Sequence, residues 1–588
     1  MKDTIIQSFD TWTDAQGIKS RNRVKSIDNI SLEGIARLRE LILELAIRGK
    51  LVPQDPNDEP ASELLKKIER EKTKLVKEGK LKKEKPLPAI TDDEKPFELP
   101  EGWEWVRIGN ITNKIGSGST PRGGSQAYTQ SGILFLRSQN VRNEGLLLDD
   151  VAYISEKTNE KMSNTIVLPN DILLNITGGS LGRSTIFPEE MQTANVSQHV
   201  TIIRPTILRS SVYLHGCVLS PYFQDMVWGR QVGANREGLS KKVLEMFEIP
   251  LPPLAEQHRI VAKVDELMAL CDQLEAEQTT HLKTHQQLVK TLLQTLTEAV
   301  DAGALQAAWQ RMSVHFDTLF CTEDSIDQLK QTILQLAIMG KLVPQNPTDE
   351  PASELLKKIA QEKAKLIKEG KLKKEKPLPA ITDDEKPFEL PEGWELVRLG
   401  EIVKINGGKR LPNSQQLVKE DTGRIYIRVT DMKNGSIDDS DLHFLTEASY
   451  SKIKKYFIEK DDIYLVIVGS TIGKSGIVPE KFHMMNLTEN AVKLKAIIFD
   501  RLYLNYALKS MFMLDQFSDR TNQLGQPKLA IVRIQSSLFT LPPLAEQHRI
   551  VAKIDELMAL CEKLSESILK AQDIKVSLSQ TIVENAVA

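Results

Sequence analysis

The chain has 588 residues, too many for one ordinary domain, so we expect several hydrophobic cores. Hydrophobic residues at 40% and charged residues at 27% are typical of a folded globular protein and exclude a disordered or membrane-embedded chain. The net charge of −3 speaks mildly against nucleic-acid binding, which usually leaves a basic footprint, so only local concentrations of basic residues could support it.

The N-terminus lacks the apolar core of a signal peptide, and no apolar run approaches the roughly 20 residues of a membrane helix. The four cysteines, Cys217, Cys271, Cys321 and Cys561, form no close pairs, which argues against a disulfide framework and a zinc ribbon. We therefore expect a protein of the reducing cytoplasm.

A long internal repeat dominates the sequence. Residues 59–103 recur at 350–394 with four changes, and LPPLAEQHRIVAKVDELMALC at 251–271 recurs at 541–561 with one. LILELAIRGKLVPQ at 41–54 also matches TILQLAIMGKLVPQ at 332–345. An offset of about 290 residues is far too long for a solenoid unit, so the chain consists of two homologous halves.

Residues 104–249 and 395–539 lie between the repeated blocks, have nearly equal lengths and differ in most of their sequence. Two stretches still align: NDILLNITGGSLGRSTIFPE (170–189) with DDIYLVIVGSTIGKSGIVPE (461–480), and NVSQHV (195–200) with NLTENA (486–491). The two variable segments are therefore expected to share one fold and to differ in surface chemistry. Gene duplication with neutral drift explains the repeat, but not why only some blocks were spared.

In chain order, residues 61–85 form a lysine-rich helical stretch that Gly79 weakens, and an extended connector follows. Its basic residues could touch phosphates, but interleaved glutamates favour a solvated face. Each variable segment is a strand-rich α/β domain. The expected strands are ILFLRS (133–138), DILLNI (171–176) and HVTIIRP (199–205) in the first segment, and RIYIRVTD (424–431), DIYLVIV (462–468) and AVKLKAI (491–497) in the second.

A long helix follows each LPPL and begins near Ala255 or Glu256 in the first copy, because the prolines prevent helix upstream. Apolar residues recur at spacings of three and four, a stripe suited to pairing with another helix. The stripe comprises Val264, Leu267, Cys271, Leu274, Leu282, Leu288, Leu292 and Leu296 in one copy and Ile554, Leu557, Cys561, Leu564, Ile568 and Ala571 in the other. A helix over 255–300 would span roughly 70 Å, and two packed antiparallel would form a stiff rod. Ordinary core helices of a bundle are the alternative.

Catalytic motifs are missing from the sequence. GSTIGKS at 469–475 is not a phosphate-binding loop, because that pattern requires glycine at Val468, although Lys474 or the aligned Arg183 could still approach a phosphate. No dinucleotide-binding glycine pattern, amino-methyltransferase motif or His/Cys cluster with metal-ligand spacing occurs. His258 and His548 are expected at the surface or in packing. We therefore expect a non-enzymatic chain.

The expected fold is an α/β (α+β) multidomain protein with an internal two-fold pseudo-repeat. Two globular strand-rich domains are separated by long helices that pair as an antiparallel coiled coil. The expected segments are an N-terminal helical region (1–58), a helix and connector (59–103), a variable domain (104–249), a spacer helix (250–303), a second helical region (304–349), a helix and connector (350–394), a variable domain (395–539) and a second spacer helix (540–588).

This organisation resembles the DNA-specificity subunits of type I restriction-modification systems over nearly the whole chain. The resemblance is carried by the twin helix starts at 251–263 and 541–553, the twin LPEGW motifs at 99–103 and 390–394, and the turn GSGSTP at 116–121. NGGKRLP at 406–412 departs from that turn. The extension before each LPEGW is similar to that of the longer members, often called type IB.

The resemblance implies that each variable segment is a target-recognition domain that reads one half of an asymmetric, interrupted site in double-stranded DNA. The paired helices would set the number of unread base pairs. They would also dock two adenine methyltransferase subunits that carry S-adenosylmethionine, and two ATP- and Mg-dependent restriction subunits would complete the nuclease. This chain itself would bind no cofactor or metal.

Candidate DNA-binding residues follow from the chemistry of readout. Phosphate contacts supply affinity, whereas Arg and Gln or Asn can make bidentate contacts to guanine and adenine. The candidates are Ser119, Thr120, Arg122, Arg137, Gln139, Arg142, Arg183, Asn235 and Arg236 in the first segment, and Lys409, Arg410, Arg428, Lys433, Lys474, Asn522, Gln523 and Lys528 in the second. Trp103, Trp105 and Trp394 are expected to be core anchors.

Two other functions compete with this interpretation. A protein-assembly scaffold would use the variable domains to bind proteins, and the near-neutral charge favours it slightly. A self-sufficient nuclease or methyltransferase is disfavoured by the missing motifs. Salt-dependent binding to duplex DNA would separate a DNA reader from a scaffold.

Overall fold

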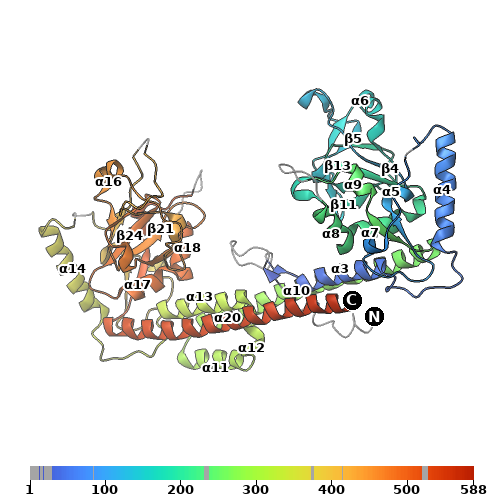
Figure 1. Ribbon diagram of the computed structural model, residues 1–588. Helices are drawn as coiled ribbons and strands as arrows, with labels where there is room; N and C mark the ends of the chain where they lie inside the picture. The colour runs from blue at the N-terminus through green and yellow to red at the C-terminus, as the bar shows by residue number, and fades with distance from the viewer. Residues whose placement is uncertain are drawn as a thin grey trace. The chain divides into compact units, whose positions relative to one another are not determined.

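The computed structural model describes residues 12, 17–18, 30–83, 85–230, 238–372, 376–412, 415–519 and 527–587 (Figure 1). The chain divides into two compact units. Unit 1 holds Asp28–His281 together with the C-terminal Ala571–Ala588, and unit 2 holds Leu282–Lys570. Each unit therefore contains one copy of the repeat and one strand-rich domain.

The base of unit 1 is helical. It consists of α3 (Glu33–Ile47), the first part of α10 (Leu254–Thr297) and the last part of α20 (Leu544–Val587), and the short strands β1 (Gly17–Ile18) and β2 (Ile30–Ser31) pair ahead of α3. Leu41 of α3, Cys271 of α10 and the partly buried Ile582 of α20 belong to one apolar cluster, which the fully buried Trp12 completes. The beginning of α10 thus packs near the end of α20.

The first strand-rich domain, called the first domain below, contains two four-stranded sheets with orders β11-β10-β13-β4 and β8-β5-β12-β9. The first sheet is antiparallel, and β12 runs parallel to β5 in the second. Side chains alternate between two apolar clusters, with Ile172 on one side of the first sheet and Leu173 on the other. The strands are β4 (Thr112–Ser117), β5 (Ile133–Leu136), β8 (Ala152–Ile154), β9 (Ile166–Val167), β10 (Ile172–Asn175), β11 (Ser184–Ile186), β12 (Ala194–Val196) and β13 (Val200–Pro205).

A two-stranded ribbon closes the first domain. Strands β3 (Glu104–Arg107) and β14 (Glu248–Leu251) pair antiparallel, so the chain enters and leaves the domain at one place. Its helices are α5 (Ile108–Ile111), α6 (Glu156–Lys161), α7 (Ser211–Leu219), α8 (Pro221–Gly229) and α9 (Lys241–Glu245), and β6 (Val141–Arg142) with β7 (Gly145–Leu146) forms a hairpin.

The lysine-rich helix α4 (Ala61–Lys77) packs against the first domain (Figure 1). Ala61, Leu64 and Ile68 are buried in that domain's core, and Lys72 Nζ donates to the carbonyl of Gly109 at 3.0 Å. The helix ends two residues before Gly79, whose positive φ of 70° glycine accommodates. Most of its other charged side chains are solvated, as the interleaved glutamates indicated.

Unit 2 repeats this plan. Its second domain has sheets with orders β16-β24-β21-β22 and β17-β23-β20, closed by β15 paired with β25. The strands are β15 (Glu395–Arg398), β16 (Val403–Gly407), β17 (Tyr426–Ile427), β18 (Met432–Lys433), β19 (Ser436–Ile437), β20 (Phe457–Ile458), β21 (Ile463–Val466), β22 (Ser475–Ile477), β23 (Met485–Leu487), β24 (Ala491–Ala496) and β25 (Leu538–Leu541). The helices are α11 (Ala302–Ser313), α12 (Phe316–Leu319), α13 (Glu323–Ile338), α14 (Ala352–Lys368), α15 (Leu399–Ile402), α16 (Glu447–Ile453), α17 (Arg501–Leu508), α18 (Met511–Asp519) and α19 (Ile531–Gln535).

The end of α10 and the beginning of α20 share the apolar core of unit 2. Leu293 and Leu296 of α10 lie in one cluster with Cys561 of α20, and the helix α13 completes it. The start of one long helix therefore meets the end of the other in each unit, which is the antiparallel pairing expected from the stripe.

Some sequence expectations need correction. Leu288 was assigned to the stripe of α10, but it is 49% exposed, whereas Val289 and Leu293 are buried. An α-helix turns every 3.6 residues, so a strict heptad drifts off the buried face. Ala571 is likewise exposed. The strand expected over 424–431 is limited to Tyr426–Ile427, because the chain then enters a 3-10 turn closed by the Asp431 carboxylate on the Arg428 N–H.

Within the part of the chain that the structure describes, no helix has both the length and the apolar character needed to cross a membrane.

Candidate nucleic-acid interface

Four polar loops of the first domain lie together. They are the early turn after β4 (118–122), the glycine turn after β10 (177–183), the connecting turn between β12 and β13 (197–199) and the exit segment before α9 (238–240). We call this set platform 1. Backbone hydrogen bonds join the loops, and their polar side chains are mostly solvent-accessible.

The early turn sits directly on the connecting turn. The Gly118 N–H donates to Val200 O at 3.0 Å, and the Ser119 N–H donates to Val196 O at 3.2 Å. A Cβ atom on Gly118 would lie 1.9 Å from Val196 O, so only glycine permits this approach.

The connecting turn in turn holds the glycine turn. The Ile176 N–H donates to His199 O at 3.0 Å, and Thr177 Oγ1 lies 2.6 Å from His199 Nδ1. The exit segment joins through the β-bridge between Thr177 and Gly238. The four loops therefore form one continuous surface.

The second domain builds the same arrangement, platform 2, from its early turn (408–412), glycine turn (468–474), connecting turn (488–490) and exit segment (527–530). The equivalent hydrogen bonds run from the N–H groups of Gly408, Lys409 and Ile467 to the carbonyls of Ala491, Leu487 and Asn490, and the Gly469 N–H donates to Pro527 O as well. Val468 and Lys528 form the bridge. A Cβ on Gly408 would lie 2.0 Å from Thr488 O. NGGKRLP thus makes the backbone contacts of the early turn although its sequence differs.

Several sequence-predicted residues meet on platform 1. Ser119, Thr120 and Arg122 are exposed on the early turn, and Thr120 Oγ1 donates to Gln198 Oε1 at 3.2 Å. Arg183 is half-buried at the end of the glycine turn, and its side chain makes no hydrogen bond or ion pair with any described residue. Platform 1 therefore combines uncharged side chains that can form hydrogen bonds with the guanidinium groups of Arg122 and Arg183.

Platform 2 is more basic. Lys409 is exposed with its Nζ 5.4 Å from the Tyr456 ring centre, and Arg410 is 82% exposed with its Nε 3.4 Å from Glu489 Oε1. Lys474 and Lys528 are exposed, and their ammonium groups have no partner among the residues that the structure describes. A local basic surface thus exists in a chain whose net charge is −3.

Arg137 and Arg428 are engaged elsewhere. Arg137 Nη2 donates to the carbonyl of Asp150 at 2.7 Å, and Arg428 Nη2 donates to that of Asp441 at 2.6 Å. Lys419 and Arg428 together lower the pKa of Asp441 to about 2. The same pair recurs in both domains, which indicates that these arginines anchor a loop. Gln139 also donates to Asp150, at 2.8 Å.

The remaining candidates are scattered or undescribed. Arg142 lies half-buried on β6, and the exposed Lys433 on β18 is ion-paired with Asp438 at 2.6 Å. Four candidates fall outside the described residues: Asn235, Arg236, Asn522 and Gln523.

Sequence reasoning missed the side chains of the connecting turns. Gln198 and His199 on platform 1 and their counterparts Glu489 and Asn490 on platform 2 were not among the candidates. The alignment of NVSQHV with NLTENA contained the signal, because a polar pair that differs between the copies follows directly on a short apolar strand.

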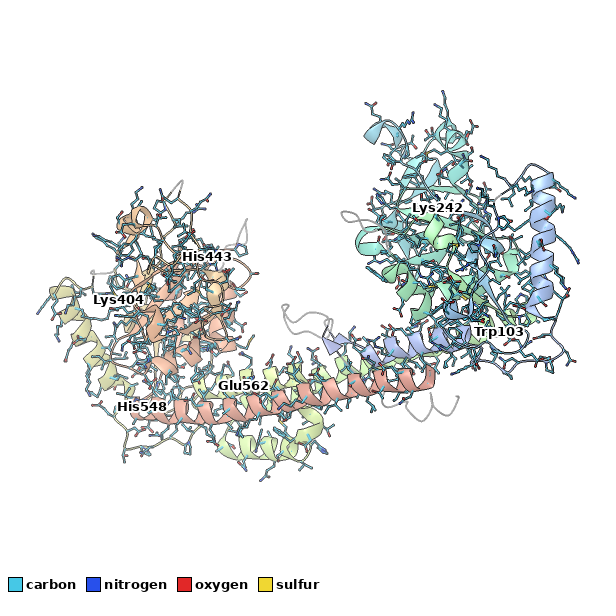
Figure 2. All side chains as sticks on the ribbon, in the orientation of Figure 1. Trp103, Lys242, Lys404, His443, His548 and Glu562 are labelled. Carbon is cyan, nitrogen blue, oxygen red and sulfur yellow. The ribbon has the colours of Figure 1, made fainter. Side chains whose placement is uncertain are left out.

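Trp103 and Trp394 are core residues as expected, whereas Trp105 is not fully buried. Trp103 and Trp394 are buried, and Trp105 is half-buried with its ring centre 4.9 Å from that of Phe97. His258 and His548 are exposed on the long helices, and Figure 2 shows His548 on the helical base of unit 2. No cluster of three metal-ligating side chains occurs among the described residues.

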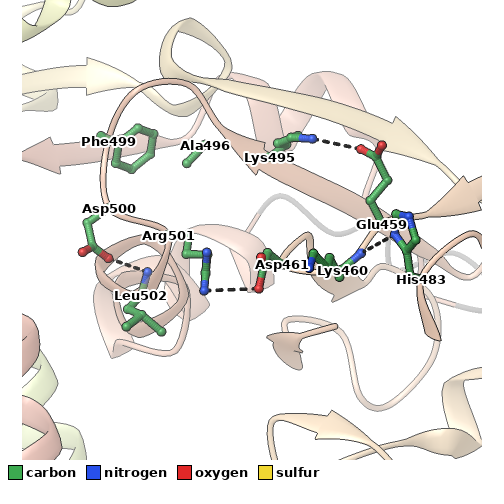
Figure 3. A pocket seen from close by; sticks show the side chains of 10 residues that line it. All are labelled: Glu459, Lys460, Asp461, His483, Lys495, Ala496, Phe499, Asp500, Arg501 and Leu502. Carbon is green, nitrogen blue, oxygen red and sulfur yellow. Dashed lines mark hydrogen bonds and ion pairs between the residues drawn. The ribbon is translucent and has the colours of Figure 1, made fainter. Parts of the chain in front are cut away.

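A polar cavity of about 700 Å³ lies elsewhere in the second domain (Figure 3). Its charges are satisfied internally: Lys495 pairs with Glu459 at 2.9 Å, and Arg501 pairs with Asp461 at 3.2 Å. The Asp500 carboxylate caps α17. The cavity offers no free charge for a ligand, in contrast to the platforms.

The model of the type I restriction modification DNA specificity domain matches residues 100–284 and 391–571, together more than half of the chain. The chain belongs to this family. Recognition of DNA sequence is the role of type I specificity subunits, which carry two target-recognition domains and are not catalytic; catalysis lies in partner subunits.

Individual relatives agree with this family assignment. The EcoAI specificity subunit of Escherichia coli is 40% identical over 99% of both chains, and the EcoEI specificity subunit of the same species is 36% identical over 99% of both. The chain is also similar to a solved structure from work on complex assembly and conformational transition of the type I R-M system, at 18% identity and a TM-score of 0.48 over 84% of this chain and 99% of that one. The HsdS subunit of Thermoanaerobacter tengcongensis gives 18% identity and a TM-score of 0.37 over 84% of this chain and 98% of that one.

Proposed function

We propose that this specificity subunit reads an asymmetric, interrupted target in double-stranded DNA, with platform 1 on one half-site and platform 2 on the other. One observation carries the proposal: the two platforms share their backbone hydrogen bonds but differ in their side chains. Thr120 and Gln198 on platform 1 correspond to Arg410 and Glu489 on platform 2. Two unlike readers in one chain fit an asymmetric target, as a symmetric dimer fits a palindrome.

The chemistry of the platforms divides into two kinds of contact. Cations without a protein partner among the described residues, the exposed Lys474 and Lys528 and the half-buried Arg183, suit phosphate oxygens, which supply affinity without sequence information. The connecting turns present amide, imidazole and carboxylate groups, which suit base edges in the major groove.

The chain would act through partners. We propose that it binds two adenine methyltransferase subunits, which supply S-adenosylmethionine, and two restriction subunits, which use ATP and Mg²⁺. Support comes from the relatives, which are named as specificity subunits of type I restriction enzymes. All four cysteines are free thiols, in keeping with a cytoplasmic complex.

The decisive experiment is to co-express the chain with its methyltransferase subunit and to map methyladenine across the host genome. The proposal expects a single interrupted, asymmetric motif. A complex that forms but adds no methylation would contradict it and favour a protein-assembly scaffold.

A domain exchange tests the assignment of half-sites. Replacing residues 104–249 with the corresponding segment of another specificity subunit should change one half-site and leave the other intact, because β3 and β14 bring the ends of the domain together. An exchange that alters both half-sites would contradict the proposal.

A further inference from the structure

Gln198 and Glu489 occupy the same position in the two connecting turns. The Val200 N–H donates to Ser197 O at 3.0 Å, and the Ala491 N–H donates to Thr488 O at 3.3 Å. Each turn is therefore a four-residue turn with Gln198 or Glu489 as its second residue. Strands of both sheets flank each turn, so its tip is fixed by the core.

Both side chains contact the same position of the early turn. Thr120 Oγ1 donates to Gln198 Oε1 at 3.2 Å, and Arg410 Nε lies 3.4 Å from Glu489 Oε1. Thr120 and Arg410 each follow the close-approach glycine by two residues. The contact between the two turns is thus retained in both domains while its chemistry changes.

Further donors hold Glu489 in place. Its Oε2 accepts from Tyr426 Oη at 3.2 Å and from Thr488 Oγ1 at 3.3 Å, yet the side chain remains one-third exposed. A fixed, accessible carboxylate beside Lys409 and Arg410 would repel phosphates. It is favourable in a DNA interface where it accepts a hydrogen bond from a base, and the N4 amine of cytosine is the donor that matches it.

The amide of Gln198 suits a different base. A glutamine can donate to N7 of adenine and accept from its N6 amine at the same time. Gln198 is exposed, and Thr120 donates to the amide oxygen without occupying both of its lone pairs.

We propose that Gln198 reads an adenine in the first half-site and that Glu489 reads a cytosine in the second, each through the exocyclic amine of the base. Thr120 and Arg410 are positioning residues that orient these side chains. The inference rests on the proposed function, since it assumes that the platforms face DNA.

The test begins with the two-part target of the unaltered chain, mapped by methylation in complex with its methyltransferase; the absence of such a target would reject the proposed function itself. The variants Glu489→Gln and Gln198→Glu are then mapped in the same way. Glu489→Gln should reduce discrimination at one cytosine of the second half-site roughly tenfold to a hundredfold and shift preference toward adenine. Gln198→Glu should act reciprocally on one adenine of the first half-site.

The matched controls use exposed residues ahead of the same strands. Glu480 lies five residues before β23, and Gln192 lies two residues before β12; the control substitutions are Glu480→Gln and Gln192→Glu. Each control makes the same chemical change away from the platform and should leave both half-sites unchanged. A Glu489→Gln complex that methylates the original target with unaltered preference overturns the inference, although the proposed function would stand.

If a variant complex no longer methylates DNA, its base preference is tested by a binding measurement instead. Duplexes carrying the mapped target are made with a base analogue that lacks the exocyclic amine at the assigned position, and binding is compared for the unaltered complex and for Glu489→Ala. Removing the amine should weaken the unaltered complex roughly tenfold and the variant hardly at all, since one hydrogen bond cannot be lost twice. Equal losses in both complexes overturn the inference.

The positioning role has its own readout. Thr120→Val should lower discrimination at the adenine read by Gln198, and Thr120→Ser, which keeps the hydroxyl donor, should restore it. A merely structural role would weaken binding to all sequences alike.

Discussion

The indole Nε1 of Trp103 donates a hydrogen bond of 2.9 Å to Oε2 of Glu256, and both side chains are buried. Trp103 ends the connector before the first domain, and Glu256 lies in the first turn of α10. The hydrogen bond therefore links the point where the chain enters the first domain to the helical base of unit 1. Trp394 and Glu546 make the same bond at 3.0 Å in unit 2.

Trp103→Phe should destabilise unit 1 by about 1–3 kcal/mol, because it leaves a buried carboxylate oxygen without its donor. Denaturant unfolding with hydrogen exchange of unit 1 peptides measures the loss. Trp105→Phe is the matched control: that indole is half-buried and makes no hydrogen bond with a described residue, so its replacement should cost less. Equal effects of the two substitutions would assign the loss to ring volume alone.

Trp103 and Glu256 both lie in repeated blocks of the sequence. No local sequence pattern, however, indicates that these two residues contact each other. Repeats, long helices and core strands were predictable, because they depend on identity and on apolar periodicity, as Leu173 and Ile202 illustrate. The platforms were only partly predictable. Thr120 and Arg410 stood out by residue type, whereas Gln198 meets Thr120 through backbone pairing across 78 residues. The assignment of Leu288 to the buried stripe was wrong. The buried face of a 3.6-residue helix shifts only slightly per heptad against a seven-residue repeat, and leucine spacing alone does not reveal that shift.

Lengthening both long helices should change the interval between the half-sites. Units 1 and 2 share α10 and α20, and each helix passes from one unit to the other near residues 281 and 570. Inserting seven helical residues into each at these points adds about 10 Å, or about three base pairs. Methylation mapping should either show both half-site sequences unchanged with a longer interval between them, or show that methylation is lost. Insertions that leave the interval unchanged would contradict a spacing role for the helices.

The first domain should lose stability in mild acid through His215. Its Nε2 is buried and has no hydrogen-bond partner among the described residues, and burial lowers the pKa of His215 to about 4. The unfolded chain, with a histidine pKa near 6.5, binds a proton between these values that the folded domain does not. The stability contribution is therefore complete well above pH 6.5 and is lost as the pH drops through 4, by about 3 kcal/mol in total.

The second domain supplies the control for this pH dependence, because Asn505 occupies the position equivalent to His215. His215→Asn should flatten the pH dependence of the first domain, and Asn505→His should introduce one in the second. Hydrogen exchange between pH 7 and pH 5, corrected for intrinsic rates, follows both domains in one chain. A slope that survives in His215→Asn must come from other groups.

Gly118→Ala should disable platform 1 while the rest of the chain still folds. The added Cβ would fall 1.9 Å from Val196 O, and a backbone carbonyl within a sheet cannot move aside as a flexible side chain can. The early turn must therefore detach from the connecting turn, which removes the Thr120–Gln198 contact.

Gly116→Ala, two residues earlier on β4, is the matched control, because its Cβ would meet no atom within 4 Å. Binding to duplexes with changes in one half-site at a time should show that Gly118→Ala has lost sensitivity to the first half-site and kept sensitivity to the second, whereas Gly116→Ala keeps both. Gly408→Ala should give the mirror result, since its Cβ would lie 2.0 Å from Thr488 O. If Gly118→Ala instead reads both half-sites normally, the early turn is not part of the reading surface, and the connecting turn and Arg183 of the glycine turn would have to carry recognition without it.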